Sequence, residues 1–208
     1  MVGNDIVDLR DPESRSESLH PRFDTRVFRE SEREGIAAAS DSERTRWKLW
    51  AAKEAAYKLA RKQQPTTVFS PPRFAVELVG DSSAVVTHDR ERYDVEYTEN
   101  DGALHAVATA QGTRSDRVIS GWRRLEAGEI ESGDPDAPSR AVRALLCERI
   151  ATALGVRASD LEVRRRGRVP HLWLRGEPAP VDLSLSHHGD WLGFACEFDF
   201  AEVGATEQ

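Results

Sequence analysis

The sequence predicts an α+β protein of two halves that are joined by an acidic connector. Three observations lead to this fold class. Residues 23–62 have the composition of helices, residues 73–110 contain strand-like runs, and a second helix followed by short strands begins at residue 139. The residues between these parts are acidic and contain glycine and proline, which is typical of a connector.

Size and composition limit the function. A chain of 208 residues fits one medium domain or two small ones packed together. Hydrophobic residues are 39% and charged residues 31% of the chain, and no apolar run reaches about 18 residues, so we expect a soluble protein without a membrane span. The net charge of −7 argues against general nucleic-acid binding. Two cysteines without metal-ligand spacing, and an N-terminus without a signal pattern, predict a reduced, cytoplasmic protein.

The first half, residues 1–112, should begin with a strand over residues 2–9 and a polar loop to about residue 20. Helices are expected over residues 23–39 and 42–62, the second of them rich in alanine, leucine, tryptophan and lysine. Prolines end this second helix, and strands are expected at 73–79, at 84–88 with 93–97, and at 104–110.

The connector, residues 113–138, leads into the second half, residues 139–208. Ser139 fits the N-cap of an amphipathic helix over residues 139–154, and Gly155 fits its C-terminal cap. Short strands are expected around 161–163, 171–174, 181–186 and 191–198.

The helix segment WKLWAAKEAAYK carries the first residues suited to chemistry. Glu54 and Lys58 are four residues apart and share one helix face, where the small Ala51 allows a strand or a ligand to approach closely. A surface ion pair worth about 0.3 kcal/mol has the same spacing and is the alternative.

Asp5 lies in the apolar run GNDIVDL near the N-terminus. A carboxylate in an apolar strand is costly without a partner, and Mg²⁺, which takes oxygen ligands, is one suitable partner. Capping of the following turn is the alternative role for Asp5.

The segment DLSLSHHGDW places Ser184 and Ser186 on one face of a strand that ends in His187, His188 and a glycine turn. Histidine beside serine suits a bound phosphate, and a solvent-exposed turn is the alternative. Ser186 does not lie in the glycine elbow of a serine hydrolase.

Arginines gather between residues 157 and 175, where six of them accompany two acidic residues and give a local charge of +4. The densest run is Arg164, Arg165, Arg166 and Arg168. Such clusters commonly bind phosphate groups, and a solvated loop is the alternative.

Together these features resemble the 4′-phosphopantetheinyl transferase superfamily. That family is marked by a G-x-D-I-x-(D/E) strand, a W/F-x-x-K-E-(A/S)-x-x-K helix and an S-H-x-G-x-W/Y strand. This chain has GNDIVDL from Gly3, WAAKEAAYK from Trp50 and LSLSHHGDW from Leu183, and the helix motif is the most specific of the three. The resemblance covers nearly the whole chain.

The motif order resembles a circular permutation of the two-half, surfactin-synthetase-activating type. That type runs from S-H-x-G to G-x-D and then to the helix, whereas this chain starts with GNDIVDL and ends just after SLSHHGDW. The resemblance implies two similar α+β halves, a pseudo-dimer of the family fold, which act as a monomer. The small holo-acyl-carrier-protein synthases share the motif order, but they are about half as long and form trimers.

Two departures from the family pattern change the expected contacts. Val7 stands two residues after Asp5, where the two-half type has an acidic residue, and Asp8 should point away from Asp5 by strand alternation. We therefore expect two protein ligands for the metal, Asp5 and Glu54. The family's G-K/R-P turn is one residue longer in the RRRGRVP segment of this chain.

The resemblance implies transfer of 4′-phosphopantetheine from coenzyme A to a serine of an apo acyl or peptidyl carrier protein, with Mg²⁺ and release of 3′,5′-ADP. Asp5 and Glu54 would hold the metal, and Glu54, or a water that it orients, would accept the serine proton. Lys58 would neutralise phosphate charge. The nucleotide would contact Ser186, His187, Arg168 and Arg140, with Lys53 as a weaker candidate.

Two other classes of protein stay open at this point. A catalytically silent module that binds coenzyme A or a carrier needs no metal pair, so the presence of Asp5, Glu54, Lys58 and His187 together argues against it. A purely structural protein would gain no magnesium-dependent protection from coenzyme A. Carrier proteins present an acidic surface, for which the candidate contacts are Arg22, Arg26 and Arg29, and a solvated helix face explains these arginines equally well.

Overall fold

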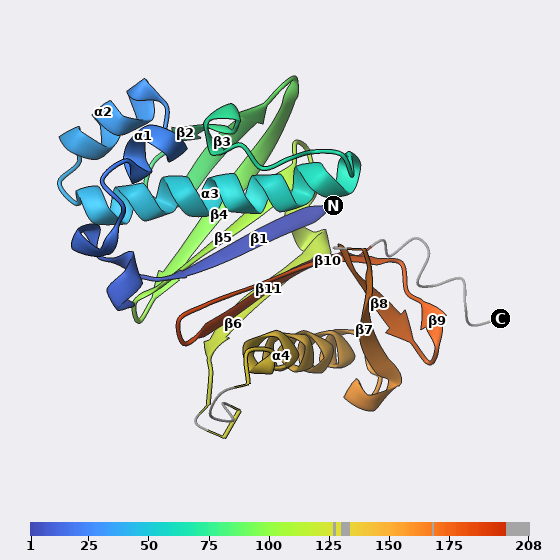
Figure 1. Ribbon diagram of the computed structural model, residues 1–208. Coiled ribbons are helices and arrows are strands. Elements are labelled where there is room, and N and C mark those ends of the chain that lie inside the picture. The colour runs from blue at the N-terminus through green and yellow to red at the C-terminus, as the bar shows by residue number, and fades with distance from the viewer. Residues whose placement is uncertain (127, 130–133, 168, 199–208) are drawn as a thin grey trace.

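The computed structural model describes residues 1–126, 128–129, 134–167 and 169–198, and these residues have the expected α+β fold (Figure 1). Every strand pair among them is antiparallel. In the same residues, no helix has the length and apolar character needed to cross a membrane.

The first part of the chain is a five-stranded sheet with a long helix across one face. The sheet has the order β1-β5-β4-β3-β2, and α3 (Ser42–Gln63) covers it (Figure 1). The strands are β1 (Val2–Asp8), β2 (Ala75–Leu78), β3 (Ser83–His88), β4 (Glu91–Asn100) and β5 (Ala103–Ala110). These elements agree with the prediction for this half, apart from the segment before α3.

Small side chains bring β1 and α3 into direct contact. A row of alanines on α3 is fully buried, comprising Ala51, Ala52, Ala55 and Ala56. A Cβ atom on Gly3 would lie 2.0 Å from the backbone oxygen of Ala55, so glycine alone fits at this position of β1. Because side chains alternate along a strand, the face of β1 that turns Gly3 toward α3 also turns Asp5 toward it.

The segment before α3 forms two helices where the sequence predicted one over residues 23–39. α1 (Phe23–Val27) ends at Phe28, and α2 (Glu30–Ala38) begins after Arg29, with both intervening residues extended. Phe28 is buried, and the Glu32 carboxylate accepts the backbone N–H of Arg29 at 2.8 Å. This cap by the Glu32 side chain starts a new helix, so the prediction of one continuous helix was wrong.

The second part of the chain packs α4 (Ala137–Leu154) against two three-stranded sheets, ordered β10-β11-β6 and β7-β8-β9. The strands are β6 (Val118–Arg124), β7 (Leu161–Arg166), β8 (Val169–Leu174), β9 (Glu177–Pro178), β10 (Val181–His188) and β11 (Trp191–Phe198). Gly155 caps α4 with a φ of +66°, as predicted, but the N-cap is Asp136 and not Ser139.

β6 lies inside the predicted connector. Ile119 packs against the core of the second part, and Trp122 packs against the cluster that contains Ile6. Packing of these apolar side chains against buried neighbours stabilises residues 118–124 as a strand of the sheet.

The two parts meet along the free edge of β1. This strand pairs with β5 on one side, and its other side lies against β10 and β11 (Figure 1). Side chains of β10 accept backbone N–H groups of β1, with Asp182 2.6 Å from Val2, Ser184 2.9 Å from Asn4 and His188 3.0 Å from Asp8. The N-terminal ammonium pairs with Glu197 of β11. The strands expected at residues 2–9 and 191–198 therefore lie in contact.

Candidate active site

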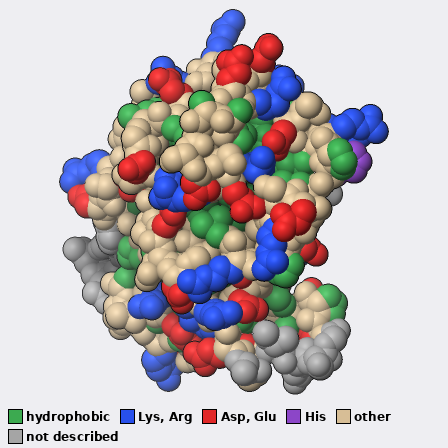
Figure 2. Space-filling view, turned by 90° about the vertical axis from the view of Figure 1, so that its left-hand side faces the viewer, with side chains coloured by type: hydrophobic (Ala, Val, Ile, Leu, Met, Phe, Trp, Pro, Cys, Tyr) green, Lys and Arg blue, Asp and Glu red, His purple; other side chains and the backbone are tan. Residues whose placement is uncertain are grey.

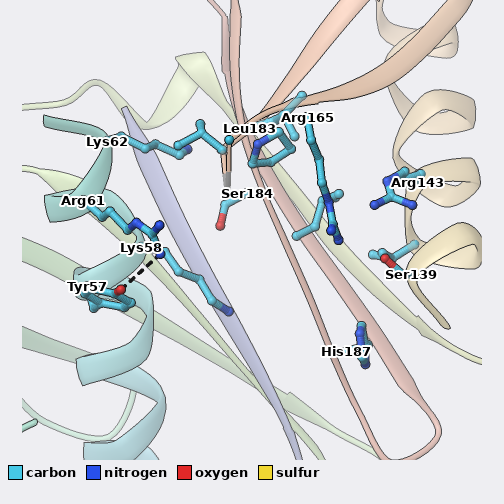
Figure 3. A pocket seen from close by; sticks show the side chains of 15 residues that line it. Tyr57, Lys58, Arg61, Lys62, Ser139, Arg143, Arg165, Leu183, Ser184 and His187 are labelled. Carbon is cyan, nitrogen blue, oxygen red and sulfur yellow. Dashed lines mark hydrogen bonds between the residues drawn. The ribbon is translucent and has the colours of Figure 1, made fainter. Parts of the chain in front are cut away.

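A cavity of about 480 Å³ lies at the junction of the two parts. α3 forms one wall and α4 the opposite wall, with β10 and the β7–β8 hairpin between them (Figure 3). The polar lining comprises Tyr57, Lys58, Arg61, Lys62, Ser139, Arg143, Arg165, Ser184 and His187. A cavity of this size accommodates a nucleotide-sized ligand.

The lining of this cavity is cationic. Among the described residues that line it, five are lysine or arginine and none has a carboxylate. Burial, and then the positive charge of Arg165, lower the pKa of Arg143, so these two arginines lie close enough to repel each other. Like charges held together in this way favour an anionic ligand between them, and arginine is particularly suited to phosphate.

Two lysines extend from α3 along the free edge of β1. Lys58 Nζ donates to the backbone oxygen of Asn4 at 2.8 Å and to Asp5 Oδ1 at 2.9 Å. One turn later, Lys62 Nζ donates to the backbone oxygen of Val2 at 2.6 Å. The lysines therefore anchor α3 to β1 while they line the cavity.

Asp5 and Glu54 form a carboxylate pair beside Lys58. The Asp5 side chain is 14% exposed and ion-paired with Lys58. Burial, and then the charge of Asp5, raise the pKa of Glu54 to about 7, while Lys58 acts in the opposite direction. The structure thus brings together Asp5, Glu54 and Lys58, which the sequence singled out.

This carboxylate pair suits Mg²⁺. The ion is held by one or two carboxylates and completes its shell with phosphate and water. A bound divalent cation would relieve the repulsion that helps to raise the pKa of Glu54. Within the described part of the chain no three potential metal-binding side chains cluster. Asp8 turns away from Asp5 as predicted, and its carboxylate accepts the backbone N–H of Arg10 at 2.9 Å.

Of the two predicted β10 residues, His187 lines the cavity and Ser186 turns away from it. Ser186 is buried, and its Oγ accepts a hydrogen bond from Asn4 Nδ2 at 2.7 Å. Ser184 lines the cavity instead. Although the His187 side chain is exposed, desolvation and then the charge of Lys58 lower its pKa.

Two of the other predicted phosphate contacts, Arg140 and Lys53, are paired with acidic side chains. Arg140 is not part of the cavity lining, and its Nη2 lies 2.5 Å from Asp134 Oδ2. Lys53 is fully buried and donates to Glu32 at 2.8 Å and to two backbone oxygens. The suggestion that Lys53 contacts phosphate was therefore wrong, because its ammonium is already enclosed by acceptors. Arg168 lies outside the described residues.

The sequence did not single out Arg61, Arg143 or Arg165 as separate contacts. Arg61 could have been found, because it lies three residues after Lys58 on the same helix face. Arg165 belongs to the noted arginine run, and strand alternation separates it from Arg164, whose guanidinium lies 4.2 Å from the ring centre of Trp173. For Arg143, the sequence contains no signal that favours it over Arg140.

Comparison with known proteins agrees with the motifs. No curated protein matches the chain. The family model described as "ACPS: 4′-phosphopantetheinyl transferase superfamily" matches residues 1–110, which include β1, α3, Asp5, Glu54 and Lys58. This match spans more than half of the 208 residues. The chain belongs to the 4′-phosphopantetheinyl transferase superfamily.

Proposed function

We propose that the chain transfers 4′-phosphopantetheine from coenzyme A to a serine of an apo acyl or peptidyl carrier protein, with Mg²⁺ and release of 3′,5′-ADP. One observation carries this proposal: a cavity lined by five lysine and arginine side chains lies beside the carboxylate pair Asp5 and Glu54. Coenzyme A has a diphosphate that needs a metal and a 3′-phosphate that needs cations. Family membership supports the same reaction.

The cavity residues would hold two parts of coenzyme A. Lys58 is beside the carboxylate pair and would contact the reacting diphosphate. His187, Arg143 and Arg165 line the part of the cavity formed by β10, α4 and β7 (Figure 3), and they would contact the nucleotide with its 3′-phosphate. Arg168, in the same hairpin as Arg165, remains a proposed contact.

The reaction needs a base, an electrophile and a stabilised leaving group. Mg²⁺ held by Asp5 and Glu54 would supply positive charge at the diphosphate. Glu54, or a water that it orients, would accept the serine proton. The serine oxygen would bond to the β-phosphorus as the bond from that phosphorus to the 3′,5′-ADP oxygen breaks. Lys58 would stabilise the negative charge that develops there.

We infer that the chain is a circularly permuted two-half member of the family. The proposed halves are residues 1–112 and 139–208, joined by residues 113–138, with β6 of the joining segment completing the sheet of β10 and β11. Two separate cores and the packing of β1 against β10 and β11 support this inference. Both parts of one chain build the cleft, so a second copy is not needed. We therefore expect a monomer located in the cytoplasm, and transfer activity should elute at the monomer's size in size-exclusion chromatography.

The carrier protein would approach near α1. Phe23 of α1 packs against Trp50, with ring centres 5.6 Å apart, one turn from Glu54 on α3. Arg22, Arg26 and Arg29 are exposed beside it. Figure 2 shows basic and acidic side chains intermingled on this side of the molecule, so docking there would depend on individual arginines and not on a broad basic patch.

Incubation with coenzyme A, Mg²⁺ and a panel of apo-carriers, followed by intact-mass analysis, tests the proposed function. At least one carrier should gain one phosphopantetheine group, and its serine-to-alanine variant should gain none. If coenzyme A binds but no carrier in a panel of fatty-acid, polyketide and peptide types is modified, the chain is instead a silent binding module.

A further inference from the structure

The proposed reaction leaves a buried polar cluster at the junction without a role. The Asn4 cluster consists of Asn4 on β1, His105 on β5 and Ser186 on β10, which are 0%, 1% and 6% exposed. Asn4 Nδ2 lies 2.7 Å from Ser186 Oγ and 3.0 Å from His105 Nε2. Ser186 Oγ in turn donates to the backbone oxygen of Gly193 at 3.4 Å. Three strands from both parts of the chain, together with β11, therefore meet in one hydrogen-bond network.

The backbone of Asn4 contacts two residues of the proposed active site. Its N–H donates to Ser184 Oγ at 2.9 Å, and its oxygen accepts from Lys58 Nζ at 2.8 Å. Both Ser184 and Lys58 line the cavity, from β10 and from α3. Asn4 thus bonds to two elements that line the cavity, β10 and α3, and it directly precedes Asp5 in the sequence.

Packing around the Asn4 cluster is tight. A Cβ atom on Gly193 would lie 2.9 Å from Ser186 Oγ and 3.1 Å from His105 Cδ2. Burial, and then the charge of Lys58, hold the pKa of His105 at about 3, so its ring is neutral and one nitrogen accepts a hydrogen bond. The cluster is therefore a fixed contact between β1, β5, β10 and β11.

One atom of the cluster lacks a partner. Asn4 Oδ1 is buried without a hydrogen bond to any described residue, and turning the amide over would leave the nitrogen unpaired instead. A buried amide that is half satisfied lowers stability, whereas an apolar side chain of similar size would not. A contribution to the neighbouring active site is a reason to hold an amide here.

We propose that Asn4 is a positioning residue that fixes β10 against β1 and thereby sets the spacing between the metal side and the nucleotide side of the active site. The geometry follows from strand alternation. Asn4 and Ser186 bond to each other, so the next residues along their strands, Asp5 and His187, turn to the other faces. One side-chain contact thus controls the placement of two site residues. The identity of the ligand rests on the proposed function.

Three variants test this role, with coenzyme A binding and transfer measured separately. Asn4→Leu removes the amide at nearly constant size, Ser186→Ala removes the partner hydroxyl, and the third variant combines both changes. Calorimetric titration with coenzyme A and Mg²⁺, without carrier, should give a Kd about tenfold higher for each single variant, and kcat should fall ~10- to 100-fold because the reacting groups are misplaced. The Kd and kcat of the double variant should be no more impaired than those of the more impaired single variant, because both changes break the same contact.

A matched control separates positioning from general destabilisation. Glu32→Gln disturbs another buried pair in the same part of the chain, with Lys53, and Glu32 is not part of the cavity lining. It should lower the urea midpoint while its Kd for coenzyme A stays unchanged. If Asn4→Leu does not fold, Ser186→Ala carries the test.

Several outcomes would overturn the positioning role. These are a wild-type Kd and kcat in folded Asn4→Leu or Ser186→Ala, additive effects in the double variant, or an equal loss of affinity in Glu32→Gln. If the wild-type protein binds coenzyme A but modifies no carrier, the proposed function fails while the Kd values still decide the role of Asn4.

Discussion

Lys53 and Glu54 are neighbours on α3, both largely removed from solvent, and their surroundings are opposite. The Lys53 ammonium is enclosed by the Glu32 carboxylate and two backbone oxygens at 2.5–3.2 Å. Glu54 lies near another carboxylate, Asp5, and it is Asp5 that forms the ion pair with the Lys58 ammonium. The first residue is fully paired, whereas at the second the charge of Lys58 only partly offsets burial and the charge of Asp5.

The difference shows how to tell a structural ion from a functional one. Burial lowers the pKa of Lys53, but Glu32 opposes the shift and keeps the pair intact. At Glu54, burial and Asp5 act in the same direction and raise the pKa to about 7. An ionisable group that its neighbours leave uncompensated has capacity for a metal ion or a proton.

The largest expected effect is on transfer activity, when Glu54 or its neighbour Asp5 is replaced. Asp5→Ala or Glu54→Ala should reduce kcat/KM for transfer by roughly 10³-fold, because each removes an oxygen ligand and the latter also removes the proposed base. Circular dichroism should show an intact fold in both variants. Full activity of either one at saturating Mg²⁺ would remove it from the site.

Lys53→Met should have the opposite character. It leaves the Glu32 carboxylate buried without its partner, so the free energy of unfolding in urea should drop by about 3–5 kcal/mol. The double variant Lys53→Met/Glu32→Leu should recover most of that loss. A stable single variant with a selective loss of coenzyme A affinity would instead make Lys53 a ligand-binding residue.

A smaller effect is expected on the nucleotide side. His187→Ala should raise the KM for coenzyme A more than the KM for dephospho-coenzyme A. The ratio of the two changes should correspond to about 1.5–3 kcal/mol, the size of a charge-assisted hydrogen bond to the 3′-phosphate. Steady-state kinetics with both substrates measures the ratio. Equal changes for both substrates would move His187 to a different role.

The smallest effect is the pH dependence of stability in metal-free protein. The pKa of Glu54 is raised in the folded state, from 4.5 to about 7, so its contribution to stability is fully present below pH 4.5 and is lost as the pH rises through 7. Between pH 5 and pH 8, wild-type protein in EDTA should therefore lose about 1–2 kcal/mol more stability than Glu54→Gln, allowing for partial solvent exposure. If the free energy of unfolding in urea changes equally with pH in the two proteins, the pKa of Glu54 is not raised in the folded state.

The sequence predicted the α3 side of the site better than the β10 and α4 side. Asp5, Glu54 and Lys58 were singled out by the resemblance of two motifs to the family, and helix and strand spacing place each of them on one face once β1 meets α3. Gly3 determines that meeting through its close approach to Ala55. The sequence signal for this side of the site therefore lies within two short motifs.

The opposite side depends on tertiary placement that no local pattern contains. Ser184 and Ser186 have the same strand parity, so alternation cannot tell which hydroxyl bonds to the Asn4 side chain and which lines the cavity. Arg140 and Arg143 are less than one turn apart on α4, and the rotation of the docked helix decides between them. In the fold, the break at Phe28 and strand β6 were missed for the same reason, since burial against distant residues produces both.

A single-turnover assay tests the account most directly. Wild-type protein and Glu54→Gln are each mixed with coenzyme A, Mg²⁺ and an apo-carrier that the panel identifies, and the intact mass of the carrier is followed over time together with 3′,5′-ADP. We expect the wild-type protein to add one phosphopantetheine per carrier and to release one 3′,5′-ADP, while Glu54→Gln binds coenzyme A and transfers almost nothing. Transfer by Glu54→Gln at the wild-type rate would contradict the assignment of the carboxylate pair as the catalytic centre.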